Sequence, residues 1–219
     1  RCIHTHPIKR DKDIRNALYA GVRTFVADNP DEVRKFRRFR ADAELLLRVS
    51  FRSPGAASDL SRKFGCDPES ALELARLVAS LGIRLRGFSF HVGSQARDAL
   101  KHVEAIEACL QLLKKARREK LGPLDTLDIG GGFPIDYTQR VPEIGRFCAP
   151  IRKALAGVPR DVRVIAEPGR FIAGPAAIGV ASVMGRAERE GLWWYYLDDG
   201  LYGSWNGQMF DHASYPIES

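Results

Sequence analysis

The 219-residue sequence has no apolar run long enough to cross a membrane, and its first residues lack the pattern of a secretory signal. It has only four cysteines, whose spacing fits neither a paired metal site nor a dense disulfide framework. We therefore expect no membrane association, no metal centre and a reducing cytoplasm as the location. No low-complexity linker interrupts the chain, and a hydrophobic content of 45% is enough for a substantial core.

A concentrated basic surface is also lacking, although the formal net charge is +7. The densest basic runs, at residues 34–38 and 114–118, lie on amphipathic helical patterns. Solvated helix faces explain them better than a nucleic-acid site, so we expect no nucleic-acid partner. A mild positive bias fits an anionic phosphate ligand.

Strand-like and helix-like segments alternate along most of the chain, which predicts a parallel sheet with covering helices. The apolar strand patterns fall at residues 2–5, 23–27, 45–51, 85–92, 124–129 and 162–166. Helices are predicted from the Asn29-Pro30 and Asp67-Pro68 start signals and from apolar spacing over 100–113 and 143–156.

Six strands are two fewer than a closed (β/α)8 barrel needs. The expected fold class is therefore α/β, an incomplete TIM-like barrel of about six strands. After Arg170, two successive strands are predicted at 176–184 and 192–197, joined by the polar turn 185–191. We predict a barrel domain over residues 1–172 and the start of a β-rich C-terminal domain over 173–219.

Two of the predicted strands end in residues suited to a phosphorylated aromatic ligand. The strand near 124–129 runs into three glycines, whose backbone N–H groups can approach a phosphate because no Cβ is in the way. A tight turn alone would explain one glycine better than three. The strand at 162–166 is followed by a carboxylate, a bare amide and a guanidinium. These residues are Gly130, Gly131 and Gly132 in the first motif and Glu167, Gly169 and Arg170 in the second.

Glu167 has two interpretations, because a buried carboxylate must be paired or neutralised. It could form a salt bridge to Arg170 or a neighbouring helix. It could instead pair with the protonated ring nitrogen of pyridoxal phosphate. Arg170 would then be able to hold a phosphate as a bidentate fork.

The strand at 85–92 ends near His91 and Ser94. His91 by itself is more typical of a satisfied core residue, but beside a phosphate site it becomes a candidate to stack on the cofactor ring. Ser94 could give a hydroxyl to the phosphate, although a serine in this position is more often a helix cap. His102 is expected to be exposed on a helix. Asp211, near the end of the chain, is either part of a surface loop or a ligand for a substrate's distal ammonium group.

Four motifs occur in order over essentially the whole chain: FHVGSQ (90–95), LDIGGGFP (127–134), AEPGRF (166–171) and DDGLYGSWNG (198–207). In these motifs the sequence resembles the pyridoxal-phosphate-dependent barrel decarboxylases of basic amino acids, the ornithine/diaminopimelate/arginine decarboxylase family. Within that family, GGGFP and FDHASYP (210–216) resemble the ornithine or lysine branch.

The resemblance implies a role for each candidate residue. It implies that His91 stacks on the pyridine ring and that Glu167 pairs with the ring nitrogen, both as catalytic residues. It implies substrate recognition by Asp211 and a place near the cofactor for Arg48. Phosphate binding is implied for Ser94, Gly132, Gly169 and Arg170, with Gly130 and Gly131 shaping the loop.

The sequence departs from the family in two places. The family's Schiff-base lysine lies in a YAVK-like motif on the first barrel strand, and no such motif occurs here. Lys9 falls at the third-strand end and is a poor substitute. The family also takes a cysteine–aspartate motif from the partner subunit's C-terminal domain, which this chain does not reach. The resemblance therefore predicts a fragment of a longer decarboxylase that is inactive alone and homodimeric when full length.

The expected function is pyridoxal-phosphate-dependent decarboxylation of a basic amino acid, L-ornithine or L-lysine, to a diamine in polyamine biosynthesis, with this small-molecule amino-acid substrate as its ligand. The alternative is a catalytically inactive regulatory homologue similar to an antizyme inhibitor. The missing lysine favours that alternative, whereas the retained phosphate and ring-nitrogen residues argue against it. An amino-acid racemase shares a similar barrel, but GGGFP and FDHASYP argue against it.

Overall fold

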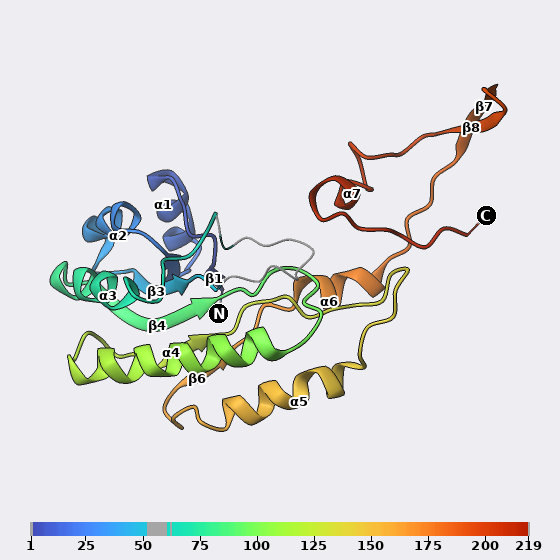
Figure 1. Ribbon diagram of the computed structural model, residues 1–219. Helices are drawn as coiled ribbons and strands as arrows, with labels where there is room; N and C mark the ends of the chain where they lie inside the picture. The colour runs from blue at the N-terminus through green and yellow to red at the C-terminus, as the bar shows by residue number, and fades with distance from the viewer. Residues whose placement is uncertain (1, 52–60, 62, 219) are drawn as a thin grey trace.

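The computed structural model describes residues 2–51, 61 and 63–218. Its six parallel strands form one curled sheet whose order follows the sequence, β1-β2-β3-β4-β5-β6. The strands are β1 (Ile3–His4), β2 (Thr24–Ala27), β3 (Glu44–Val49), β4 (Arg84–Phe90), β5 (Thr126–Asp128) and β6 (Arg163–Ile165). Figure 1 shows the helices packed along the outside of this sheet. The described residues thus confirm an α/β fold with six of the eight strands of a (β/α)8 barrel.

The helices follow the strands in regular alternation. They are α1 (Asp11–Tyr19), α2 (Pro30–Lys35) continued by the 3-10 turn η1 (Phe36–Phe39), α3 (Ala71–Ser80), α4 (Leu100–Arg118), α5 (Ile144–Leu155) and the short α6 (Gly169–Ala173). Asn29 caps α2 as predicted, since its side chain accepts a hydrogen bond from the Glu32 backbone N–H at 2.9 Å.

The sequence patterns do not predict α1. A short helical period is nevertheless present, because Ile14 is buried and Ala17 and Leu18, three and four positions on, pack against the core. The first turn of α1 is stabilised by charge. Asp13 accepts a hydrogen bond from the Arg10 backbone N–H and pairs with the Arg10 guanidinium at 2.9 Å.

The hydrophobic core lies between the sheet and the helices. Leu47 on β3, Phe88 on β4 and Leu127 on β5 are in register across three strands, and all three are fully buried. Burial of each such side chain stabilises the fold by about 1.5–3 kcal/mol. Because side chains alternate along a strand, the next residue of each strand faces the concave side of the sheet.

Beyond α6 the chain forms the 3-10 turn η3 (Gly174–Ala176), an antiparallel hairpin of β7 (Val183–Arg189) and β8 (Leu192–Leu197), and the short α7 (Gly207–Phe210). This confirms a β-rich start, and Figure 1 shows the hairpin projecting away from the sheet. The predicted strand at 176–184 and the predicted turn at 185–191 are both wrong, because the strand runs over Val183–Arg189. The turn is only Glu190 and Gly191, both with positive φ, and such two-residue turns match the twist of the flanking strands.

None of the described helices combines the length and apolarity that a membrane crossing requires. The described part of the chain also holds no group of three or more histidine, cysteine, aspartate or glutamate side chains placed to bind a metal ion.

Candidate active site

The three predicted strand-end motifs meet at the carboxyl ends of β4, β5 and β6. A Cβ built on Gly131 would lie 2.6 Å from the Glu167 carbonyl oxygen and 3.7 Å from Nε2 of His91. The Glu167 backbone N–H donates to the Gly130 carbonyl at 2.7 Å. The structure therefore brings His91, the glycine loop (130–132) and Glu167 to one place on the rim.

Each residue of the glycine loop is held so closely that a side chain would collide with neighbouring backbone. Gly130 has φ +63° and a Cβ there would lie 2.0 Å from the Phe90 carbonyl oxygen. Gly132 has φ +98° and its Cβ would lie 2.5 Å from the Gly93 carbonyl oxygen. Within the described residues, the amides of Gly131 and Gly132 donate no hydrogen bond, although Gly131 is buried. Such unpaired amides fit an anionic ligand such as a phosphate.

His91 lies beside this loop as a half-buried, neutral imidazole. Its Nδ1 accepts a hydrogen bond from the Gly93 backbone N–H at 3.1 Å, so the ring orientation is held locally. Burial and then the charge of Arg48 lower the pKa of His91 to about 4. A neutral ring fixed in this way can lie against a flat aromatic ligand. Ser94, three residues further on, is also half-buried.

Two carboxylates and one guanidinium lie on the concave side of the rim. Asp128 is fully buried, and burial together with the charge of Glu167 raises the pKa of Asp128 to about 7. Glu167 itself is exposed. Burial lowers the pKa of the Arg48 guanidinium, against the opposing effect of the carboxylates of Asp28, Glu167 and Asp128. These groups can bind a ligand that carries both a proton and a negative charge.

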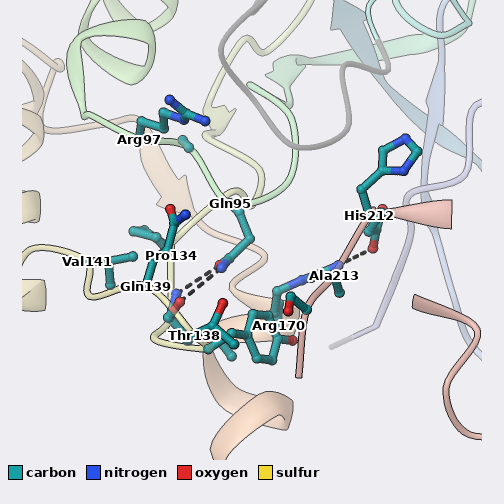
Figure 2. A pocket seen from close by; sticks show the side chains of 14 residues that line it. Gln95, Arg97, Pro134, Thr138, Gln139, Val141, Arg170, His212 and Ala213 are labelled. Atoms are coloured by element: carbon teal, nitrogen blue, oxygen red, sulfur yellow. Dashed lines mark hydrogen bonds and ion pairs between the residues drawn. The ribbon is translucent and has the colours of Figure 1, made fainter. Parts of the chain in front are cut away.

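Arg170 pairs with Asp211 and not with Glu167. Its Nη2 donates to Asp211 Oδ2, which links the barrel rim to the C-terminal segment. Both residues line a pocket of about 460 Å³ together with Gln95, whose amide exchanges two hydrogen bonds with the Ile135 backbone. Figure 2 shows Arg170 and Gln95 around this pocket. Arg170, predicted to bind the phosphate, and Asp211, predicted to bind the substrate, are therefore direct neighbours.

The expectation that His102 is exposed is wrong. His102 is fully buried on α4, and its Nε2 lies 3.0 Å from the Gly131 carbonyl oxygen. Its ring packs 5.2 Å from the Phe133 ring and 5.9 Å from the Phe147 ring, centroid to centroid. Burial lowers the pKa of His102, so the ring is neutral and Nε2–H can donate to that carbonyl. The spacing of three residues to buried Ala105 was the signal that could have placed it in the core.

Asp128 has no assigned role in the sequence-based prediction, although it stands inside the LDIGGGFP motif. Its Oδ1 accepts a hydrogen bond from the Gly130 backbone N–H at 2.9 Å, and this bond fixes the start of the glycine loop. The signal for this residue is a single charged side chain within an otherwise apolar, buried strand.

Lys9 is buried, and its ammonium group is fully engaged with the chain around it. Nζ donates to the carbonyl oxygens of His6, Pro7 and Val26 and lies 3.3 Å from Oε1 of Glu32. Burial lowers the pKa of Lys9 to about 8. An amine held in this way serves the structure of the β1–β2 edge, in keeping with the prediction that it does not replace the cofactor-bonding lysine.

Comparison with known proteins gives a consistent result. Residues 1–174 match the family described as pyridoxal-dependent decarboxylase, pyridoxal binding domain. A lysine/ornithine decarboxylase from Selenomonas ruminantium is 35% identical over 217 residues, which are 98% of this chain and 55% of that protein. The chain thus spans about half the length of the curated relatives that it matches.

Solved structures agree with the sequence comparison. The lysine/ornithine decarboxylase of Vibrio vulnificus, complexed with cadaverine, is 55% identical with a TM-score of 0.90, over 98% of this chain and 56% of that one. The same enzyme complexed with putrescine is 54% identical with a TM-score of 0.89, over the same shares of the two chains. SrLDC in complex with PLP and cadaverine is 32% identical with a TM-score of 0.85, over 98% of this chain and 54% of that one.

Proposed function

The chain belongs to the family of pyridoxal-dependent decarboxylases, and from this premise we propose that the protein carrying it converts L-ornithine or L-lysine to a diamine and CO₂. The family, the enzyme class and the pyridoxal cofactor expected from the sequence are confirmed at the level of the family. The observation that supports the reaction best is the meeting of His91, the glycine loop and Glu167 on one rim.

The residues of this rim fit pyridoxal phosphate. When bound, this cofactor supplies an electron-withdrawing ring that accepts the electron pair left at Cα as CO₂ departs. The unpaired amides of the glycine loop are suited to its phosphate. Further phosphate contacts are proposed for Ser94, Gly169 and Arg170, and Arg48 is proposed to lie near the cofactor.

His91 and Glu167 are proposed to control the ring of the cofactor. The neutral imidazole of His91 would lie against one face of the ring and fix its plane. The Glu167 carboxylate would accept a hydrogen bond from the ring nitrogen and so hold the proton on that atom. Holding this proton keeps the ring cationic while the bond to the carboxylate of the substrate breaks, which is the main contribution of the chain to the rate.

Asp211 is proposed to bind the distal ammonium group of the substrate. Its ion pair with Arg170 holds the Asp211 carboxylate at the 460 Å³ pocket, beside the proposed phosphate ligands. The Vibrio vulnificus relative is complexed with putrescine and with cadaverine, which are the diamines that ornithine and lysine would yield. A carboxylate at this position suits both, because each carries an ammonium group at its far end.

We extend the proposal to the organisation of the protein. Residues 1–172 would form the cofactor-binding barrel domain and residues 173–219 part of a C-terminal β domain. The full-length protein would be a homodimer that acts in polyamine biosynthesis in the cytoplasm. The four free cysteines are in keeping with a reducing compartment.

Release of CO₂ by the full-length protein tests this function directly. With pyridoxal phosphate and L-ornithine, L-lysine or L-arginine as substrate, we expect the matching diamine from ornithine or lysine at the highest rate. Failure to bind pyridoxal phosphate, together with no CO₂ release from any of the three substrates, would favour the inactive regulatory homologue. Binding of pyridoxal phosphate without CO₂ release would contradict the proposed decarboxylation.

A further inference from the structure

A row of polar side chains crosses the concave face of the sheet beside the glycine loop. In the parallel register, Arg48 on β3 lies beside Ser89 on β4, and Ser89 lies beside Asp128 on β5. Residues in register point to the same face of a sheet. The preceding row, with Leu47 and Phe88, packs into the core under the helices. The polar row therefore faces the concave side, where a closed barrel has its interior.

Asp128 is tied to Glu167 through one residue of the glycine loop. Gly130 donates its backbone N–H to Asp128 Oδ1 at 2.9 Å and accepts from the Glu167 backbone N–H at 2.7 Å. The other oxygen, Oδ2 of Asp128, is buried and has no hydrogen-bond partner among the described residues. A buried carboxylate oxygen without a donor is unfavourable, whereas a protonated one can itself donate to a neighbouring acceptor.

The charges around Asp128 favour that proton. The pKa of Asp128 is raised by burial first and by the Glu167 carboxylate second, and Arg48 opposes this rise. His91 adds no charge at neutral pH, because burial and Arg48 lower the pKa of its imidazole to about 4. Asp28, at the end of β2, acts on Arg48 from the other side. Burial and the neighbouring Glu167 carboxylate both disfavour a negative charge on Asp128, so Asp128 is the group that holds the proton.

We propose that Asp128 is a positioning residue for Glu167. In its protonated form it donates a hydrogen bond from Oδ2 to the Glu167 carboxylate and so aims that carboxylate at the cofactor's ring nitrogen. The inference rests on the proposed function for the role of Glu167. The protonation of Asp128 depends only on the chain itself.

Carbon-13 NMR of the full-length protein, labelled at its aspartate side chains, measures the protonation of Asp128 directly. It needs neither bound cofactor nor turnover. The Asp128→Asn variant identifies the resonance of Asp128 by its disappearance. We expect a titration midpoint near pH 7 for that carboxyl group. A midpoint near the ordinary aspartate value of about 4 would overturn the proposal.

Three variants test the positioning role through the affinity for pyridoxal phosphate, followed by absorbance from pH 6 to pH 9. Asp128→Ala removes the donor, and we expect affinity to fall by up to about ten-fold, as for loss of one hydrogen bond, and by no more than in Glu167→Ala. Asp128→Asn keeps a donor that cannot ionise, so it should restore most of the affinity lost in the alanine variant. Asp125→Asn is the matched control at the opposite end of β5, where Asp125 pairs with Arg86 at 2.6 Å and not with Glu167.

The pH profile separates positioning from a merely structural effect. In the parent protein, this proton leaves as the pH rises through the Asp128 midpoint, so affinity should fall over that range. Asp128→Asn should lack this fall, and Asp125→Asn should keep it. Identical profiles for the parent and Asp128→Asn would refute the inference, even if the alanine variant fails to fold. Absence of cofactor binding in the parent would instead count against the proposed function, and the NMR midpoint would still stand as a separate result.

Discussion

The central strands of the barrel, β2 to β5, and the strands of the C-terminal hairpin are both rich in apolar residues, yet only the barrel strands of this comparison are largely buried. β3 carries three successive leucines, Leu45, Leu46 and Leu47, each fully buried. β8 has the sequence LWWYYL, and each of its six side chains is 44% exposed or more. An apolar sequence was thus sufficient to form a strand in both regions but sufficient to bury it in only one.

The difference lies in how the strands are connected. Parallel strands need crossover connections, and in this chain those connections are helices that cover the sheet. β7 and β8 are joined by a two-residue turn that brings no covering element with it. Within the described residues no helix or further strand packs on the aromatic side chains of β8, and the Arg186 guanidinium of β7 lies 5.1 Å from the Trp193 ring centre. The hairpin therefore gains ladder hydrogen bonds without a core of its own.

Truncation of a large side chain should give the largest difference between the two regions in the free energy of unfolding. Phe88→Ala, on β4, removes a fully buried ring, and we expect a loss of about 3–5 kcal/mol in the free energy of unfolding. Trp194→Ala, on β8, removes a ring that is 54% exposed, and the loss should be about 1 kcal/mol or less. Urea unfolding measures both, and equal losses would mean that the hairpin is packed in solution.

Substitution of the two acidic site residues should change different kinetic parameters, because Glu167 lies on the barrel rim and Asp211 in the C-terminal segment. Glu167→Ala should lower kcat of the full-length enzyme by about 10²-fold or more, with a much smaller effect on cofactor affinity. Asp211→Ala should chiefly raise KM for ornithine or lysine, by about ten-fold. Steady-state assays at saturating cofactor distinguish them, and an unchanged KM would remove Asp211 from substrate recognition.

Added methyl groups should discriminate the tight barrel rim from the open hairpin. In Gly131→Ala the new Cβ would meet the Glu167 carbonyl oxygen at 2.6 Å, so we expect a loss of about 1–3 kcal/mol and weaker cofactor binding. The matched variant is Gly185→Ala on β7, where a Cβ meets nothing within 4 Å. Its unfolding free energy should stay within about 0.5 kcal/mol of the parent. A loss as large as that of Gly131→Ala would contradict the open geometry of β7.

The smallest expected effect concerns a hydrogen bond behind the glycine loop. His102→Phe keeps an aromatic ring near Phe133 but removes the bond to the Gly131 carbonyl, which should cost about 1 kcal/mol and weaken cofactor binding. Leu100→Ala on the same helix changes a side chain that is 62% exposed and serves as the control. Cofactor titration alongside thermal unfolding measures both, and a His102→Phe protein with parental cofactor affinity would show that the loop needs no such support.

Local patterns in the sequence were enough for much of the fold and for the location of the site. The alternation of strands and helices, the six barrel strands and the N-cap at Asn29 follow from periodicity and turn chemistry, which act over a few residues. The glycine loop, His91 and Glu167 could be placed on one rim because parallel strands end at the same edge. α1 was not predicted although Ile14, Ala17 and Leu18 have helical spacing, because this apolar stripe covers a single turn of a nine-residue helix.

By itself, then, the sequence determined which residues end the strands and which chemistry they can offer, since those properties depend on near neighbours along the chain. Only the tertiary structure decided which side chains pair. It placed Arg170 against Asp211, buried His102 in the core and linked Asp128 to Glu167 through Gly130. These contacts join residues 29 to 41 positions apart, and burial and charge between such distant partners exist only once the chain has folded.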